Sequence, residues 1–186
     1  ETNWSTVTQG LKANELIWAV STDQGRTWSE PQLIPMPIPG SAEAPGPLCV
    51  TRSGRWIVCY APGNTFDPQL QVDRSQIVAM YSDNQGRSWQ HTEMLRFAQP
   101  ANGAEAWVVE LADGRLLGTS WVIPDDGTES PNAYAVSSDG GTTWSRIASS
   151  KTMLSNLRIG AASAEPSSCC TASGAVMSST GTTISR

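Results

Sequence analysis

The chain has 186 residues, enough for one domain, and 39% of them are hydrophobic, with 8 tryptophans among them. Its 17 acidic residues outnumber its 12 lysines and arginines, so the net charge is −5 and no basic stripe would attract a nucleic-acid backbone. No apolar run reaches the roughly 20 residues of a membrane-spanning helix, and residues 1–20 lack the pattern of a signal peptide. We expect a packed domain with no nucleic-acid partner and no membrane span.

Short strand-like runs separated by turns follow one another along the chain. They predict four-stranded antiparallel units in the order strand, glycine turn, strand, long loop, strand, tryptophan turn, strand. Gly54, Gly114 and Gly174 recur every 60 residues and mark the glycine turn of each unit. The expected units are, in chain order, a half unit at 1–45, complete units at 46–98 and 105–150, and a half unit at 163–186.

The tryptophan turn follows the template Ser-x-(Asp/Asn)-x-Gly-x-(Thr/Ser)-Trp three times. In each copy we expect the Asp or Asn side chain to accept hydrogen bonds from turn amides, the Gly to adopt a positive φ, and the Trp to fold back as a hydrophobic plug. A strand-like run precedes each copy, which predicts a hairpin turn. The fixed positions are Ser21, Asp23, Gly25 and Trp28, then Ser82, Asn84, Gly86 and Trp89, then Ser137, Asp139, Gly141 and Trp144.

These turns resemble the Asp-box (BNR) repeats of the sialidase superfamily, whose members are usually six-bladed β-propellers. The resemblance covers nearly the whole chain and implies an all-β fold, a β-propeller of four-stranded antiparallel blades with Asp-box turns. It also implies a glycan or glycoconjugate as partner, no cofactor, and an extracytoplasmic or secreted location. The Asp boxes themselves are expected to be structural, because function must be argued from sites and not from folds.

The expected units add up to about three blade equivalents, whereas closed propellers have about 4 to 8 blades. We therefore expect the chain to be a central fragment of a longer six-bladed protein. Association of two copies through open blade edges is the alternative, since unpaired strand edges favour self-association.

Both kinds of turn lie on one rim of an up-and-down blade, so we expect the chemistry at the opposite rim, where the longer loops lie. Long loops on a rigid sheet are the usual carriers of binding groups. The segments expected on this rim are 29–45, 61–75, 96–106, 121–131 and 146–166.

Glu105 is the sharpest catalytic candidate on that rim. The run from Glu105 to Arg115 is similar to the sialidase segment in which a glutamate polarises the nucleophilic tyrosine, and the resemblance implies this role for Glu105. Glu43 and Glu165 stand at similar places in the neighbouring repeats. A glutamate that bonds backbone amides is therefore an alternative reading of all three.

Candidate substrate-binding residues come from the same loops. Sialidases hold the substrate carboxylate with three arginines; at the place of one of them this chain has Trp121, which can stack on a sugar ring but cannot pair with a carboxylate. Arg158 resembles a later arginine of that triad. Asp67, Asp73 and Arg74 crowd the loop 61–74, either as groups that converge on a pocket or as solvated loop charges.

The remaining reactive residues predict neither a metal site nor a serine hydrolase. The acidic run from Asp125 to Glu129 lacks the alternating spacing of calcium ligands, and the cysteines lack the spacing of a zinc site. The cysteines on either side of the Gly54 turn read as small buried core residues, with a disulfide as the alternative. His91, the single histidine, reads as a surface residue, which leaves no base for a Ser-His-Asp triad. The four cysteines are Cys49, Cys59, Cys169 and Cys170.

Two functions remain open, together with a purely structural or truncated product. The first is a sialidase-like glycoside hydrolase that acts on or recognises a glycan at the loop-rich rim, with Glu105 near the reaction centre. The second is a non-catalytic propeller that binds glycan or protein through Trp107, Trp121 and the acidic loops.

Overall fold

The computed structural model describes residues 3–98, 100–147 and 175–178, and every regular element in these ranges is a β-strand. The strands are β1 (Trp4–Ser5), β2 (Gly10–Leu11), β3 (Leu16–Val20), β4 (Gln32–Ile34), β5 (Ser41–Glu43), β6 (Cys49–Val50), β7 (Trp56–Gly63), β8 (Gln76–Ser82), β9 (Gln90–Arg96), β10 (Ala101–Glu110), β11 (Leu116–Pro124), β12 (Ala133–Ser137), β13 (Ser145–Ile147) and β14 (Ala175–Ser178). The predicted all-β class with antiparallel sheets is confirmed.

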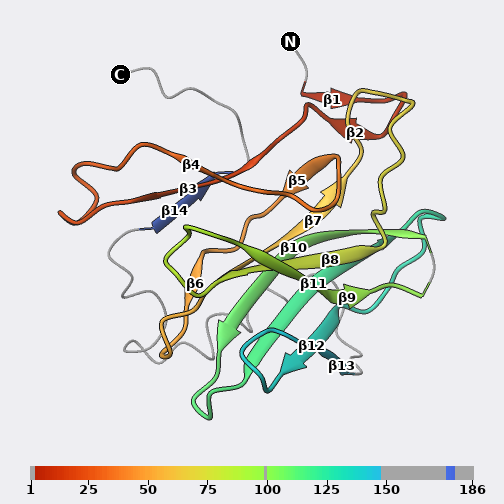
Figure 1. Ribbon diagram of the computed structural model, residues 1–186. Coiled ribbons are helices and arrows are strands. Elements are labelled where there is room, and N and C mark those ends of the chain that lie inside the picture. The colour runs from red at the N-terminus through yellow and green to blue at the C-terminus, as the bar shows by residue number, and fades with distance from the viewer. Residues whose placement is uncertain (1–2, 99, 148–174, 179–186) are drawn as a thin grey trace.

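Two antiparallel sheets form the centre of the molecule (Figure 1). The first has the order β6-β7-β8-β9, with β5 paired to the far end of β7, and the second has the order β10-β11-β12-β13. All residues of β8 are buried, because β8 has a strand on either side and a packed layer on either face. Such doubly covered strands carry apolar residues without alternation, as the run Ile77 to Tyr81 does.

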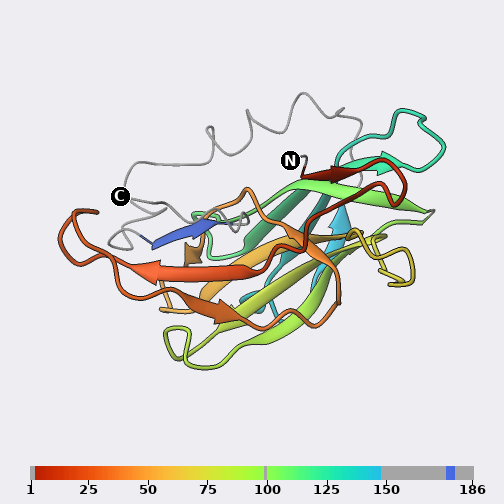
Figure 2. The ribbon, with the colours of Figure 1, turned by 90° about the horizontal axis from the view of Figure 1, so that it is seen from above.

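The N-terminal part of the chain adds a smaller sheet. Strands β3 and β4 form a hairpin, and β14 pairs with the other edge of β3 in the register Ala175 with Val20. Both ribbon views place β14 beside β3 (Figures 1 and 2). Strands from the two expected half units therefore share one antiparallel sheet. Closure of the sheets into a ring stays a prediction.

The three Asp boxes fold in the same way. In the third, the Ser137 hydroxyl donates to Asp139 and accepts the amide proton of Gly141 at 2.8 Å, while Asp139 accepts from both the amide and the hydroxyl of Thr143. The first box repeats these bonds. The second box does so too, except that its Asn84 side chain donates to the Ser88 hydroxyl. The box glycines have φ between 81° and 91°, a region that residues with a β-carbon rarely adopt.

The tryptophans of the boxes differ in burial. Trp89 and Trp144 are half-buried and pack against the two core clusters, as a plug should. Trp28 remains 41% exposed, so the expectation of a hydrophobic plug is wrong at this position. Its ring lies over its own Gly25, and it belongs to neither core cluster of the described residues.

Neighbouring sheets meet through these same turns. A β-carbon on Gly86 would lie 2.6 Å from the Trp18 ring, and one on Gly141 would lie 3.3 Å from the side chain of Ile57. The glycine of each later box thus touches a strand of the preceding sheet. Trp18 also stacks edge-on against Trp56, with ring centroids 5.1 Å apart.

The glycine turns and the Asp boxes share one rim. Arg52, in the turn between β6 and β7, donates to the carbonyls of Leu111 and Ala112 in the turn between β10 and β11. Arg55, from the same first turn, donates to the carbonyl of Gly140 in the third Asp box. This arrangement leaves the other rim to the longer loops.

The cysteine and histidine predictions are confirmed for the described residues. Cys49 and Cys59 are buried in the core under β6 and β7, and neither forms a disulfide within the described part of the chain. His91 lies exposed on β9. Gly174, Glu165, Cys169 and Cys170 lie outside the described residues.

Candidate functional site

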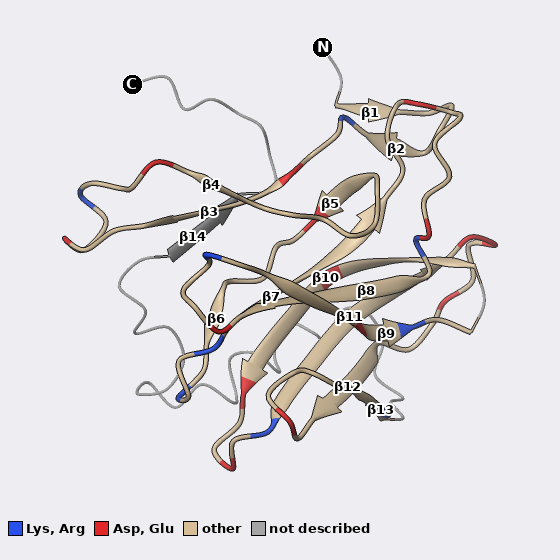
Figure 3. Ribbon diagram, in the orientation of Figure 1, with Lys and Arg blue, Asp and Glu red and all other residues tan. Residues whose placement is uncertain are grey.

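Three loops meet at the rim opposite the Asp boxes. Arg74, at the end of the loop after β7, donates to the side chain of Asn102 on β10 and to the carboxylate of Asp125 after β11, each at 2.7 Å. Charged residues in general lie on loops and strand ends, and β7 and β8 carry none (Figure 3). At this rim a charged group of one central sheet thus pairs with a charged group of the other.

Glu105 occupies an irregularity in β10. The pairing of β10 with β11 shifts between Ala104 and Trp107, which is the mark of a β-bulge. Glu105 itself has a φ of 51°, a left-handed conformation that is unfavourable for a residue with a side chain. Its side chain is half-buried, and none of the hydrogen bonds or ion pairs among the described residues involves its carboxylate. A carboxylate at this bulge is available to a ligand.

Glu43, at the end of β5, is the nearest acidic neighbour of Glu105. The Oε1 atom of Glu43 accepts the backbone amide proton of Glu105 at 3.3 Å. Its Oε2 atom is buried and makes no hydrogen bond within the described part of the chain. Burial raises the pKa of Glu43 to about 7, the amide hydrogen bond acts against this, and the nearby charge of Glu105 adds to it. Glu43 is thus close to half-protonated at neutral pH.

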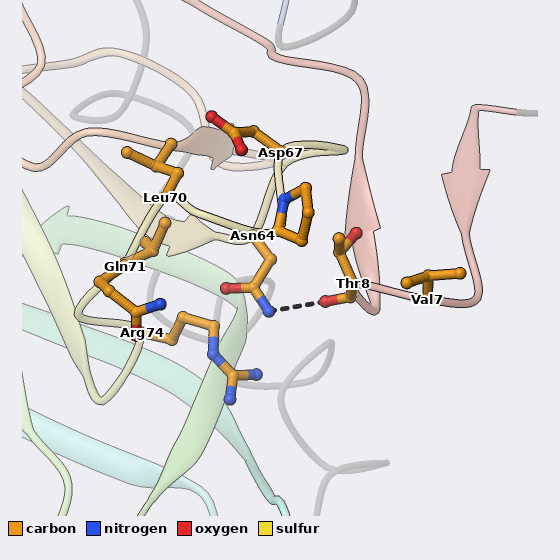
Figure 4. Close-up of a pocket in the computed structure, with 9 residues that line it drawn as sticks. Val7, Thr8, Asn64, Asp67, Leu70, Gln71 and Arg74 are labelled. Carbon is orange, nitrogen blue, oxygen red and sulfur yellow. Dashed lines mark hydrogen bonds between the residues drawn. The ribbon is translucent and has the colours of Figure 1, made fainter.

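A pocket of about 280 Å³ opens beside these strands, between the hairpin of β1 and β2 and the loop after β7. Figure 4 shows the Asn64 side chain bridging the two, where it donates to the carbonyl of Thr8 at 2.8 Å. The hairpin can come this close because Gly10 has no β-carbon, which would lie 2.4 Å from the carbonyl oxygen of Thr65. The lining residues are Val7, Thr8, Asn64, Asp67, Pro68, Leu70, Gln71, Val72 and Arg74.

The pocket adjoins the strands that carry the two glutamates. Val72 of the pocket packs against Gly40, directly before β5, and β5 ends at Glu43. Arg74 of the pocket holds Asn102, three positions before Glu105 on β10. The pocket thus adjoins the strands of the two glutamates, while neither glutamate lines it.

The other candidate residues take different places. Asp67 and Arg74 line the pocket, whereas Asp73 turns away from it and accepts hydrogen bonds from Arg96 and Gln76. Trp121, which is half-buried on β11, pairs in the ladder with Ala104, the residue before Glu105. Arg158 lies outside the described residues.

Glu43 was not among the site residues predicted from the sequence. The signal was present in the repeated Ala-Glu pair, which places Glu43 at the position equivalent to Glu105 in the preceding unit. The reading of this glutamate as one that bonds a backbone amide agrees with the Glu43 geometry. That the amide belongs to Glu105 depends on the packing of β5 against β10 and could not be read from spacing.

The described residues contain no group of three or more His, Cys, Asp or Glu side chains placed to hold a metal ion. None of the described residues forms a helix that is long and apolar enough to cross a membrane.

The fold and the Asp boxes define an all-β protein built of antiparallel sheets with Asp-box turns. Residues 3–174 match the family described as the BNR repeat-like domain, and the chain belongs to that family. The resemblance drawn from the tryptophan turns is thereby confirmed.

Three similar proteins come from bacteria. A sialidase of Bacteroides fragilis is 27% identical over 157 residues, which cover 81% of this chain and 27% of that protein. A crystal structure of the intramolecular trans-sialidase from Ruminococcus gnavus in complex with oseltamivir carboxylate has a TM-score of 0.47 and 27% identity, with 70% of this chain and 25% of that chain covered. A Dyadobacter fermentans protein of unknown function has a TM-score of 0.53 and 22% identity, over 68% of this chain and 36% of that chain, and supports the fold alone. The chain spans about a quarter of the length of the two sialidases.

Proposed function

We propose that the chain forms part of a sialidase-like glycoside hydrolase that binds its glycan at the loop-rich rim, with Glu105 as the catalytic residue. The observation that carries the proposal is the conformation of Glu105, a non-glycine residue in a left-handed bulge whose carboxylate has no hydrogen-bond or ion-pair partner within the described residues. Backbone strain of this kind gathers at active sites, because the surrounding structure must hold it against its cost. Membership of the BNR repeat-like family and the likeness to a sialidase support the same assignment.

The chemistry proposed for Glu105 is that of a general base or of a partner for a nucleophile. An ionised carboxylate accepts a proton from a phenol or a water molecule, and the oxygen it activates attacks the anomeric carbon of the sugar. The neighbouring Glu43 has its pKa raised to about 7, chiefly by burial.

Of the proposed binding residues, Asp67 and Arg74 line the pocket. The pocket offers both hydrogen-bonding groups, such as those of Asn64 and Gln71, and apolar side chains, such as those of Leu70 and Val72. This mixture suits a sugar ring, which has polar hydroxyl groups and an apolar face. The proposed substrate-binding residues are Asp67, Asp73, Arg74, Trp121 and Arg158.

A second candidate is a propeller that binds glycan without cleaving it. It is favoured by Trp121, whose half-buried indole stands next to the bulge where a sialidase would present an arginine. An indole stacks on a sugar but gives no charged hydrogen bonds to a carboxylate. Arg74 does not supply the missing charge freely, since it is already paired with Asp125.

The deciding experiment compares Glu105→Gln with the unaltered chain on a panel of aryl glycosides that includes a sialoside. We expect turnover to fall by about 10²- to 10⁴-fold, the usual effect of losing a general acid or base. Glu129→Gln, which alters an exposed glutamate of the same rim, is the matched control. Unchanged turnover in Glu105→Gln would remove the assignment. Glycan-array binding without turnover, reduced in Trp121→Ala, would establish the second candidate instead.

A further inference from the structure

We propose that Glu43 is a positioning residue that holds the backbone of Glu105 in its left-handed conformation and so fixes the direction in which the Glu105 carboxylate projects. The catalytic consequence rests on the function proposed above, while the geometric part is independent of it. A hydrogen bond of 3.3 Å joins the two residues, from the Glu105 amide to Oε1 of Glu43.

The bulge explains why Glu105 needs an outside partner. Ala104 pairs with Trp121 and Trp107 pairs with Thr119, so Glu105 lies between two registers and outside the regular ladder. A backbone amide that leaves the ladder must find another acceptor, because an unpaired amide in a partly buried position is unfavourable. Glu43 supplies that acceptor from a different sheet.

The two strands are fixed relative to each other on both sides of this bond. Glu43 pairs with Ala61 in the ladder of β5 and β7. The chain after Glu43 runs so close to β10 that a β-carbon on Gly46 would lie 2.7 Å from the carbonyl oxygen of Ala106, which is fully buried. The backbone that carries Glu43 is therefore held in place, so its carboxyl group can fix the position of the Glu105 amide, as a positioning residue must.

The surroundings of Glu43 favour its neutral form in the acidic range. The titratable groups that face it are Glu105 on β10 and the buried thiol of Cys59 on β7, with Cys49 on β6 beyond it. Glu43 takes part in none of the ion pairs among the described residues. Below neutral pH a protonated Glu43 still accepts the amide bond through its carbonyl oxygen and adds no second negative charge beside Glu105. Above neutral pH the two carboxylates repel each other.

The geometric test measures hydrogen exchange of the Glu105 amide by NMR in the full chain. Glu43→Gln keeps an acceptor oxygen at the same reach and is expected to exchange as the unaltered protein does. Glu43→Leu removes the acceptor and is expected to speed exchange of this amide by about tenfold or more, the effect of losing one hydrogen bond. The ladder amides of β10 that face β11 are the internal control.

Glu43→Asp, one methylene shorter, is the second variant and is expected to resemble Glu43→Leu. Unchanged exchange of the Glu105 amide in both Glu43→Asp and Glu43→Leu would overturn the inference.

The functional test measures turnover, or glycan binding if the chain does not turn over, between pH 5 and 9. We expect Glu43→Gln to retain function and to lose a pH step near 7 that the unaltered protein shows, and Glu43→Asp to lose function. A purely structural role would not move the pH profile and would show no rescue by Gln. If Glu105→Gln proves as active as the unaltered protein, the proposed function fails, yet the exchange measurement still decides whether Glu43 positions Glu105. A retained pH step in Glu43→Gln would refute the assignment of that step to Glu43.

Discussion

Replacing Glu43 with glutamine should change how the stability of the protein depends on pH. The pKa of Glu43 rises from its ordinary value of 4.5 to about 7 in the folded chain, chiefly through burial. Because the folded pKa lies above the unfolded one, the stability contributed by the protonated group is fully present below pH 4.5 and is lost as the pH rises through 7. At about 1.4 kcal/mol for each tenfold change in the acid dissociation constant, the loss approaches about 3 kcal/mol. Glutamine does not titrate and escapes this loss.

Urea denaturation at pH 4, 5, 6, 7 and 8 measures the effect. The difference in unfolding free energy, Glu43→Gln minus unaltered chain, should grow by about 3 kcal/mol between pH 4 and pH 8. The buried side-chain amide of the glutamine also changes the unfolding free energy by an amount that does not depend on pH. This constant does not affect the test, because only the change of the difference with pH is interpreted. Glu129→Gln, at an exposed position, should show a flat difference. A flat difference for Glu43→Gln as well would refute the reasoning from burial.

Three further predictions concern the turns and the packing. Ser137→Ala leaves the buried amide of Gly141 without its acceptor and should lower the free energy of unfolding by about 1 to 3 kcal/mol in urea titrations, while Ser145→Ala at an exposed site should be nearly neutral. Gly46→Ala should cost about 1 to 3 kcal/mol because its β-carbon would meet the carbonyl oxygen of Ala106, whereas Gly63→Ala finds ordinary contact distances; equal thermal midpoints for the two would contradict this. The hydrogen bonds from Thr143 lower the pKa of Asp139 from 3.8 to about 2, so its stabilisation is present above pH 3.8 and is lost as the pH falls toward 2. Asp139→Ala should therefore be destabilised at pH 6 and should converge with the unaltered chain near pH 2, as followed by circular dichroism.

The local turns of the fold were predictable from sequence because their chemistry is contained within eight residues. The spacing of Ser137, Asp139, Gly141 and Trp144 fixes which hydroxyl, carboxylate and amide can meet, and no distant residue is needed to form the turn. The burial of the tryptophan is different in kind. Trp28 has the same spacing yet stays largely exposed, because burial depends on what packs over the turn and not on the turn itself.

The sequence predicted which segments form the rim but not the directions of their side chains. Alternation of turns and loops indicates which segments share a rim, and the bonds of Arg74 to Asn102 and Asp125 agree with that assignment. The direction of each loop side chain depends on long-range packing, so sequence could not tell that Asp73 pairs with Arg96 while its neighbour Arg74 lines the pocket. The Glu105 bulge was equally hidden, since nothing in the run of residues around it marks a change of register.

The contact between the glycine of each of the two later Asp boxes and the preceding sheet has a consequence for unfolding. Gly86 packs against Trp18 and Gly141 packs against Ile57. Each of these glycines therefore closes a hairpin and also contacts the preceding sheet. Loosening one hairpin then exposes a flank of the next, and breakdown spreads sideways by adjacent pairs, as in linear repeat arrays. Resistance to proteases should accordingly be set by the weakest of these junctions and not by the average strength of the whole.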